Sequence, residues 1–190
     1  GLGDVYKRQP LLIPPFVGAI SWLQLFGNNQ GLNAVFGREL WNIYGADGVI
    51  FLMTLHSYPV VYIIVAAALR SIPADLELAA CISGAGNARV LRTVTLPLLG
   101  PALLSAFTLT AVSNLADFGI PSILGSPVRF ETLATMVYRM MESGIVANPL
   151  QVVSTIGTVL LVLGIVAVVA DHVVSVSYTH LRAHETKANL

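Results

Sequence analysis

Long apolar runs separated by polar connections limit what this chain can fold into more than any other feature. A helix needs about 20 mostly apolar residues to cross a bilayer, and four segments approach that length: residues 10–26, 49–69, 96–115 and 150–170. Only 11% of the residues are charged and 55% are hydrophobic, whereas a soluble domain carries about 25% charged residues. We therefore expect an all-α integral membrane protein, a bundle of about four transmembrane helices.

Charge and cysteine content argue against two classes of function. The formal net charge is zero, so no nucleic-acid partner is indicated. The single cysteine, Cys81, cannot form an internal disulfide and fits no metal-ligand spacing. We expect no metal site and no catalytic residue.

Both termini differ abruptly from the sequence between them. "GLGDVYKRQ" at residues 1–9 and "SVSYTHLRAHETKANL" at 175–190 hold all the lysines, and three of the four histidines lie in or beside the second peptide. Both resemble terminal peptides of translated adaptor or vector sequence. We expect them to be a non-native leader and tail, which leaves residues 10–174 as the transmembrane domain, a fragment of a longer protein.

Arginine placement predicts the orientation, because positively charged residues stay on the cytoplasmic side of a membrane. The connection between the second and third spans carries Arg70, Arg89 and Arg92, so we place it in the cytoplasm. The connections at 27–48 and 117–149 then face outward, and their Gly, Asn and Pro content is typical of turns and short surface helices.

The cytoplasmic connection, residues 71–97, is named the elbow here. Its pattern predicts a helix over 74–83, an interruption at Gly84 and Gly86, and a second helix over 87–95. Pro97 is expected at the start of the next span, where its missing N–H costs little. Such an elbow suits docking, because a partner's motion can pass through it to the spans on either side.

The stretch "LAACISGAGNARVLRTVTLP" resembles the cytoplasmic coupling loop of binding-protein-dependent ABC transporter permeases. That family's pattern is Glu-Ala-Ala, three residues, Gly, nine residues, Ile, one residue, Leu-Pro. The glutamate position holds Leu78 here, and Glu77, one residue earlier, is expected to substitute for it in part. The resemblance implies these ATPase-coupling residues: Glu77, Ala79, Ala80, Gly84, Leu96 and Pro97.

The resemblance extends over most of residues 10–174 and is strongest to ferric-iron transport permeases, in "IPPFVGAISWLQLFG", "LTLHSYPVVYIIVAAALRSI" and "NLADFGIPSILG". It implies the fold of type I ABC importer permeases, with the elbow as coupling helix. In that family each half of the permease has six spans. By this comparison the chain would supply the last four spans of the first half. The second half would be a fused or separate partner.

The function that the resemblance implies is a permease subunit of an ATP-driven importer for ferric iron. It would move substrate from a periplasmic binding protein to the cytoplasm by alternating access, as a multi-pass protein of the bacterial inner membrane. No Walker-type "GxxxxGKS" occurs, so the chain would bind no cofactor, and a cytoplasmic ATP-binding partner subunit would hydrolyse ATP. Alternative substrates are phosphonate, thiamine, polyamine, sulfate and molybdate. A membrane-embedded enzyme and a scaffold are alternatives of another class.

Polar side chains within the spans are the remaining candidates, since such groups are costly in lipid and usually face a partner or a cavity. Asn114 and Asp117 are spaced to share one helix face. We expect the two residues to line the substrate pathway or to form a gate; the alternative for Asp117 is that it caps the end of the helix. His56 and Tyr58 lie beside Pro59 in the second span. They are pathway candidates, although a buried His that supports a kink is the alternative.

Overall fold

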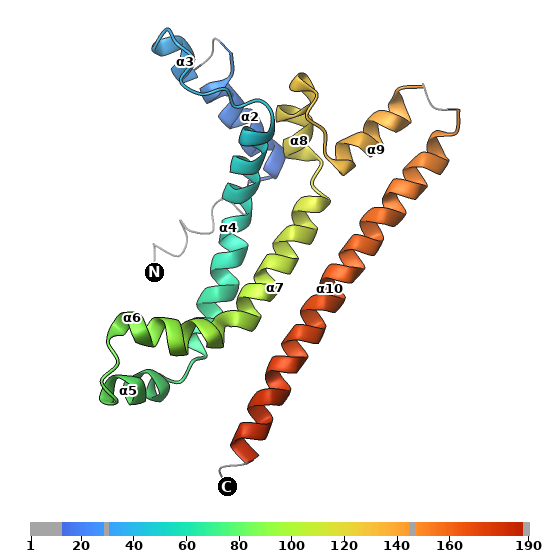
Figure 1. Ribbon diagram of the computed structural model, residues 1–190. Coiled ribbons are helices and arrows are strands. Elements are labelled where there is room, and N and C mark those ends of the chain that lie inside the picture. The colour runs from blue at the N-terminus through green and yellow to red at the C-terminus, as the bar shows by residue number, and fades with distance from the viewer. Residues whose placement is uncertain (1–12, 29–30, 145–146, 188–190) are drawn as a thin grey trace. The chain divides into compact units, whose positions relative to one another are not determined.

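The computed structural model describes residues 13–28, 31–144 and 147–187, with side chains described as far as residue 174. Within these ranges every regular element is a helix (Figure 1), which confirms the predicted all-α class. The elements are α2 (Pro15–Phe26), α3 (Gly31–Val35), α4 (Ala46–Arg70), α5 (Ala74–Ile82), α6 (Asn87–Val90), the π-helix η1 (Leu91–Thr95), α7 (Leu96–Leu115), α8 (Gly119–Leu124), the 3-10 helix η2 (Ser126–Val128), α9 (Leu133–Glu142) and α10 (Pro149–Lys187).

Three described helices are long and apolar enough to cross a membrane, namely Ala46–Arg70, Asn87–Leu115 and Pro149–Val174. They overlap the second, third and fourth predicted spans. The first predicted span, 10–26, contains α2, whose 12 residues extend about 18 Å against a hydrocarbon core of about 30 Å. Residues 10–12 lie outside the described ranges, as does the predicted leader, so the first span remains a prediction.

The chain divides into two compact units that each gather distant segments. The first unit contains the described residues up to Pro59 together with Val112–Leu163, and the second contains Val60–Ala111 together with the described residues from Gly164 onward. The predicted tail begins inside α10, which continues as helix to Lys187.

The first unit is organised around a buried apolar core in which α2 packs against α8. The core residues are Ala19, Ile43, Val49, Leu52, Ile120 and Leu124. Two glycines permit close contacts: a Cβ at Gly18 would lie 2.6 Å from Cε1 of His56, and one at Gly48 would collide with the carbonyl of Ile43. Helices can therefore approach more closely here than larger residues would allow.

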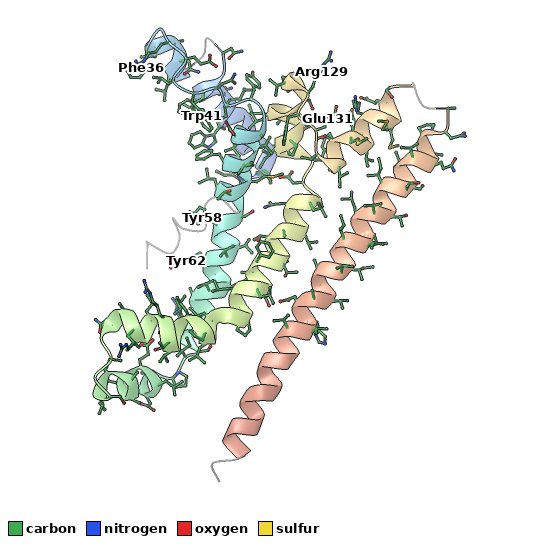
Figure 2. The ribbon with its side chains drawn as sticks, viewed as in Figure 1. Phe36, Trp41, Tyr58, Tyr62, Arg129 and Glu131 are labelled. Atoms are coloured by element: carbon green, nitrogen blue, oxygen red, sulfur yellow. The ribbon has the colours of Figure 1, made fainter. Side chains whose placement is uncertain are left out.

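Four aromatic rings close one side of this core. Trp22 stacks on Phe26 at 5.8 Å between centroids, and Phe51 meets the edges of Trp22 and Trp41 at 5.1 and 5.2 Å. Phe26 also contacts Trp41 at 5.4 Å, so the rings form a continuous circuit (Trp41 is labelled in Figure 2). Offset and edge-to-face pairs of this kind are favourable beyond the area that they bury.

The second unit contains the elbow and the helical segments that continue from it. Here α5 packs back against α6 and η1, and the chain changes direction between α6 and α7 (Figure 1). Further along, the Ser105 hydroxyl donates to both carboxylate oxygens of Asp171 at 3.1 and 3.2 Å, which ties α7 to α10. Sequence reasoning missed this pair, although a carboxylate at the end of a long apolar run was an available signal.

Candidate functional site

The elbow turns on a Schellman motif at the end of α5. The Ala85 N–H donates to the Ala80 carbonyl at 3.1 Å and the Gly84 N–H donates to the Cys81 carbonyl at 2.9 Å, which are the two hydrogen bonds that define this helix end. Good helix formers precede the turn, and α5 begins directly after Pro73. The first helix, the turn and the start of the second helix therefore lie where the sequence pattern predicts them.

Gly84 occupies the left-handed position that the motif requires, with φ of +83°. A Cβ at Gly84 would meet no atom within 4 Å, so the constraint is conformational and not steric. A left-handed backbone costs an L-residue roughly 1–2 kcal/mol. Gly86 has φ of −72°, which any residue adopts, so the two glycines have different roles.

A side-chain hydrogen bond joins the two helical parts of the elbow. The Thr95 hydroxyl donates to Oε1 of Glu77 at 2.8 Å, across 18 positions of sequence. Thr95 is 5% exposed, and it is the last residue of η1. Sequence reasoning missed Thr95, because a threonine in a helical run gives no signal of its partner.

The second helix of the elbow does not end before Pro97, contrary to the prediction. α6, η1 and α7 form one continuous helix over Asn87–Leu115, so Pro97 lies inside it and not at its start. The π turn explains how this is possible: the Leu96 N–H donates to the Leu91 carbonyl, five residues back. The wider turn gives the proline ring room against the preceding carbonyls, with which it would clash in an α-helix.

α5 is open to its surroundings and exposes apolar side chains beside its two carboxylates, Asp75 and Glu77. Ile82 is 87% exposed and Leu78, one turn earlier, is 57% exposed, while Cys81 and Ala79 are also exposed. Ala80 is half-buried. The predicted coupling residues thus fall into two groups, one on α5 and its turn, the other, Leu96 and Pro97, at the start of α7.

Asn114 and Asp117 do not share a helix face, so that part of the prediction is wrong. α7 ends at Leu115, and Asp117 Oδ1 accepts a hydrogen bond of 2.8 Å from the N–H of Gly119, the first residue of α8. This is an Asx turn in the connection between α7 and α8, because Asp117 precedes Phe118, the N-cap residue of α8, which has no side-chain cap hydrogen bond. Asn114 Oδ1 accepts from the Ser57 hydroxyl at 3.0 Å, which links α7 to α4 within the first unit.

His56 is enclosed between α4 and α2. Its Nδ1 lies 3.3 Å from the Leu52 carbonyl of its own helix, and its Nε2 is buried without a hydrogen-bond partner. Tyr58 lies one turn before Tyr62 on α4 (Figure 2). Among the residues that the structure describes, no cluster of three or more His, Cys, Asp or Glu side chains could hold a metal ion.

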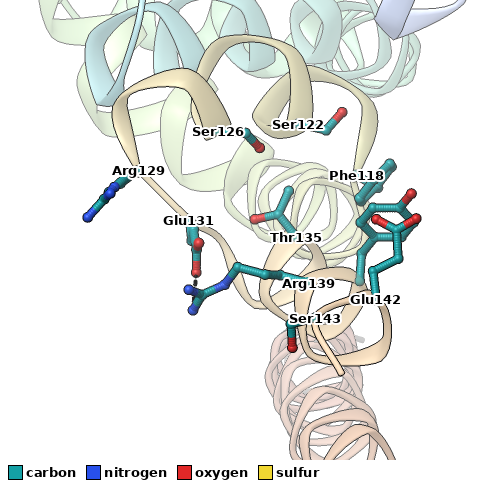
Figure 3. A pocket seen from close by; sticks show the side chains of 10 residues that line it. Phe118, Ser122, Ser126, Arg129, Glu131, Thr135, Arg139, Glu142 and Ser143 are labelled. Carbon is teal, nitrogen blue, oxygen red and sulfur yellow. Dashed lines mark ion pairs between the residues drawn. The ribbon is translucent and has the colours of Figure 1, made fainter. Parts of the chain in front are cut away.

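A polar hollow of about 980 Å³ lies in the first unit, between α8 and α9 (Figure 3). An ion pair of 2.9 Å between Arg139 and Glu131 crosses it, and Arg129 lies at its rim, directed away from that pair. A hydrogen bond to Glu142 and the charge of that carboxylate raise the pKa of Tyr138 above its ordinary value. Sequence reasoning placed this segment on the outward side but did not identify the hollow, whose lining comes from separate helices.

Comparison with known proteins matches residues 10–184 to the family model described as "Binding-protein-dependent transport system inner membrane component". The ferric transport system permease protein FbpB of Actinobacillus pleuropneumoniae is 30% identical over 142 residues, which are 72% of this chain and 20% of that protein. The molybdenum transport system permease protein ModB of Escherichia coli strain K12 is 28% identical over 148 residues, 74% of this chain and 63% of its own length.

A probable sulfate transport system permease protein, cysT of Chlorella vulgaris, is 28% identical over 142 residues, 73% of this chain and 53% of its own length. The chain therefore spans about a fifth of the ferric relative and less than two thirds of the others.

Proposed function

The chain belongs to the family of binding-protein-dependent transport system inner membrane components, and we propose that it is the permease subunit of an ATP-driven importer. It is a multi-pass inner-membrane protein with three described helices of spanning length. In this function the elbow would receive the motion of a cytoplasmic ATP-hydrolysing subunit.

The observation that carries this proposal is the form of the elbow. It lies between two helices of spanning length, its turn is fixed by a Schellman motif, and α5 presents Leu78 and Ile82 to the outside without burying any residue. Exposed apolar side chains on a preorganised helix are what a helix-in-groove contact requires. In the proposed complex, α5 lies in a groove of the ATPase subunit.

The mechanism follows from the connection between the elbow and the spans. ATP-driven closure of the partner subunits would displace α5, and the continuous helix over Asn87–Leu115 would carry that displacement into the membrane. Asn114 and Ser57 join α7 to α4 by a hydrogen bond, so the two helices would move together at that point. Substrate would pass between this chain and a second permease half, whether fused or separate.

The outward segments are the proposed contact for an extracytoplasmic substrate-binding protein. α8 and α9 supply a hollow with charged side chains of both signs, which suits a polar and reversible contact. The relatives differ in their named substrates, which are ferric iron, molybdenum and sulfate. We propose ferric iron for this chain, with molybdate and sulfate as the competing substrates.

Thiol cross-linking from Cys81 tests the docking contact. Cys81 is exposed on α5, so a short bifunctional thiol reagent should join it to a cysteine placed in the groove of the ATPase subunit. The matched control is Cys81→Ser with a new cysteine at Ser71, which is exposed in the same predicted cytoplasmic connection but outside α5. Cross-linking from Cys81 but not from position 71 supports docking, and equal or absent cross-linking from Cys81 contradicts it.

Gly84→Leu tests whether the elbow couples ATP hydrolysis to uptake. The substitution should uncouple hydrolysis from uptake in proteoliposomes, because Leu does not tolerate the left-handed backbone at this position. Gly86→Ser is the matched control, since the Gly86 backbone accepts any residue, no atom lies near its Cβ, and serine is favoured at this N-cap position of α6. Unchanged uptake in Gly84→Leu would refute the coupling role. Supplying radiolabelled Fe(III), molybdate or sulfate, each with its loaded binding protein, identifies the substrate.

A further inference from the structure

We propose that Glu77 is a positioning residue that acts through Thr95, binding α5 to the helix that enters the membrane. This inference rests on the proposed function and specifies how the elbow would transmit motion. In this role Glu77 does not offer its charge to the ATPase subunit. Its Oε1 accepts the Thr95 hydroxyl at 2.8 Å, and Thr95 ends the π turn from which α7 continues.

The attachment of α5 depends on this bond because burial contributes little. Among its nine residues none is buried, and the Schellman motif fixes only its C-terminal end. In the described part of the elbow, no other side-chain hydrogen bond links α5 to η1. A hydrogen bond to a charged acceptor is stronger than one between neutral groups. Such a bond suits a contact that must keep α5 attached to η1 while the elbow moves.

Helix geometry separates Glu77 from the docking face. Consecutive residues on an α-helix are about 100° apart, so Glu77 and Leu78 cannot point the same way. Leu78 shares the outer face with Ile82, and both are largely exposed. Glu77 is directed toward the buried Thr95. The family's acidic position is thus apolar and outward here, while the neighbouring acid, although exposed, is bonded to Thr95 of the elbow itself.

Glu77→Gln, Glu77→Ala and Thr95→Val separate the internal role from a charged contact. Gln retains an oxygen that can accept the Thr95 hydroxyl, Ala removes the acceptor, and Val replaces the hydroxyl with a methyl group of similar size. Thr93→Val is the matched control, because the Thr93 hydroxyl bonds only the Arg89 carbonyl of its own helix, at 2.8 Å.

Amide hydrogen exchange over residues 74–83, measured on the full chain in lipid nanodiscs, is the first measurement. Glu77→Ala and Thr95→Val should each accelerate exchange about tenfold, and the double variant no more than either single one. Thr93→Val should stay within about twofold of the parent chain. Glu77→Gln should accelerate exchange less than Glu77→Ala, because it keeps an acceptor for the Thr95 hydroxyl but loses the charge. Equal acceleration in Thr93→Val and Thr95→Val would overturn the inference, because the effect would then be one of helix propensity.

The second measurement is the number of ATP molecules hydrolysed per Fe(III) taken up, in proteoliposomes with the ATPase subunit and loaded binding protein. Glu77→Ala and Thr95→Val should raise this ratio while Cys81 still cross-links to the ATPase, and Glu77→Gln should raise it less than Glu77→Ala does. If Glu77→Gln fails like Glu77→Ala while Thr95→Val behaves as the parent, Glu77 acts by charge and the inference is wrong.

Failure of the proposed function would give a different result. The exchange pattern would hold, but the parent chain would neither cross-link to an ATPase subunit nor couple hydrolysis to uptake. That outcome would leave the Glu77–Thr95 bond as a structural contact and overturn its role in coupling.

Discussion

The core of the first unit and the elbow are both helical, but they are stabilised by different interactions. In the core, six apolar side chains from separate parts of the chain are buried together, beside a circuit of four aromatic rings. In the elbow, α5 buries no residue and is fixed by a backbone motif and one side-chain hydrogen bond. The core therefore distributes its stability over many contacts, whereas the elbow concentrates it in a few.

This difference follows from what a docking element must do. A helix that offers its apolar residues to a partner cannot also bury them in its own fold, so Leu78 and Ile82 contribute nothing to holding α5 in place. Local polar interactions then have to supply the rigidity. Single substitutions should accordingly act through packing in the core and through individual hydrogen bonds or backbone angles in the elbow.

Leu52→Ala should have the largest effect, a loss of about 2–4 kcal/mol in the free energy of unfolding. Leu52 is fully buried, and its truncation leaves a cavity among tightly packed neighbours. The quantity can be measured by denaturation in mixed micelles, followed by the fluorescence of Trp22 and Trp41, which pack against the core. Ile50→Ala on the same helix is the control, since Ile50 is 61% exposed. Equal losses in the two variants would show that burial does not dominate this unit.

Asn33→Ala should come next, with a loss of about 1–3 kcal/mol. The Asn33 amide donates to the carbonyls of Phe26 and Trp41 at 3.0 and 3.1 Å, and its oxygen accepts the Leu40 N–H at 2.8 Å. Its removal leaves partly buried backbone groups unpaired, which should accelerate amide exchange at Leu40.

The control for Asn33 is Asn42→Ala, which removes one exposed hydrogen bond, from the Tyr44 N–H at 3.0 Å. Its effect should be below about 1 kcal/mol. If both asparagines give the same exchange rates, the buried network is not what stabilises this connection.

Gly84→Ala should have the smallest effect, about 1 kcal/mol, confined to exchange of the amides in the Schellman turn. Gly84→Asn should lose less, because asparagine enters the left-handed region more readily than alanine. Gly86→Ser should lie within about 0.5 kcal/mol of the parent, because serine suits the N-cap position that Gly86 occupies. A loss at Gly86 as large as that at Gly84 would contradict the conformational explanation.

The all-helical class and the limits of the elbow could be predicted from the sequence because they depend on local signals. Apolar runs indicate spans, and Gly84 after a run of helix formers indicates a helix end. The φ of +83° at Gly84 agrees with that interpretation. The role of Gly84 as the left-handed residue of a Schellman motif becomes visible only when the two hydrogen bonds are seen.

The sequence-based predictions that were wrong or incomplete concern features whose geometry extends beyond a single helical turn. Pro97 was expected at a helix start because nothing in the sequence marks a π turn, which lets a proline follow within a continuous helix. Asp117 was expected on the same face as Asn114 because the end of α7 at Leu115 could not be located to within two residues. The Glu77–Thr95 bond spans 18 positions, and periodicity carries no information about such a pair.

The π turn also determines the directions in which the side chains of α7 point around the helix axis. A π turn is equivalent to one residue inserted into an α-helix, and each residue rotates the helix by about 100°. The side chains of α7 are therefore turned by roughly a quarter of a circle from where an uninterrupted α-helix starting at α6 would place them. Elbow and span thus share one continuous backbone, but their side chains are offset in angle by the π turn. Insertion or deletion of a single residue within Leu91–Thr95 would therefore rotate the whole spanning helix and displace Thr95 from Glu77, while the two hydrogen bonds of the Schellman turn at Gly84 would remain.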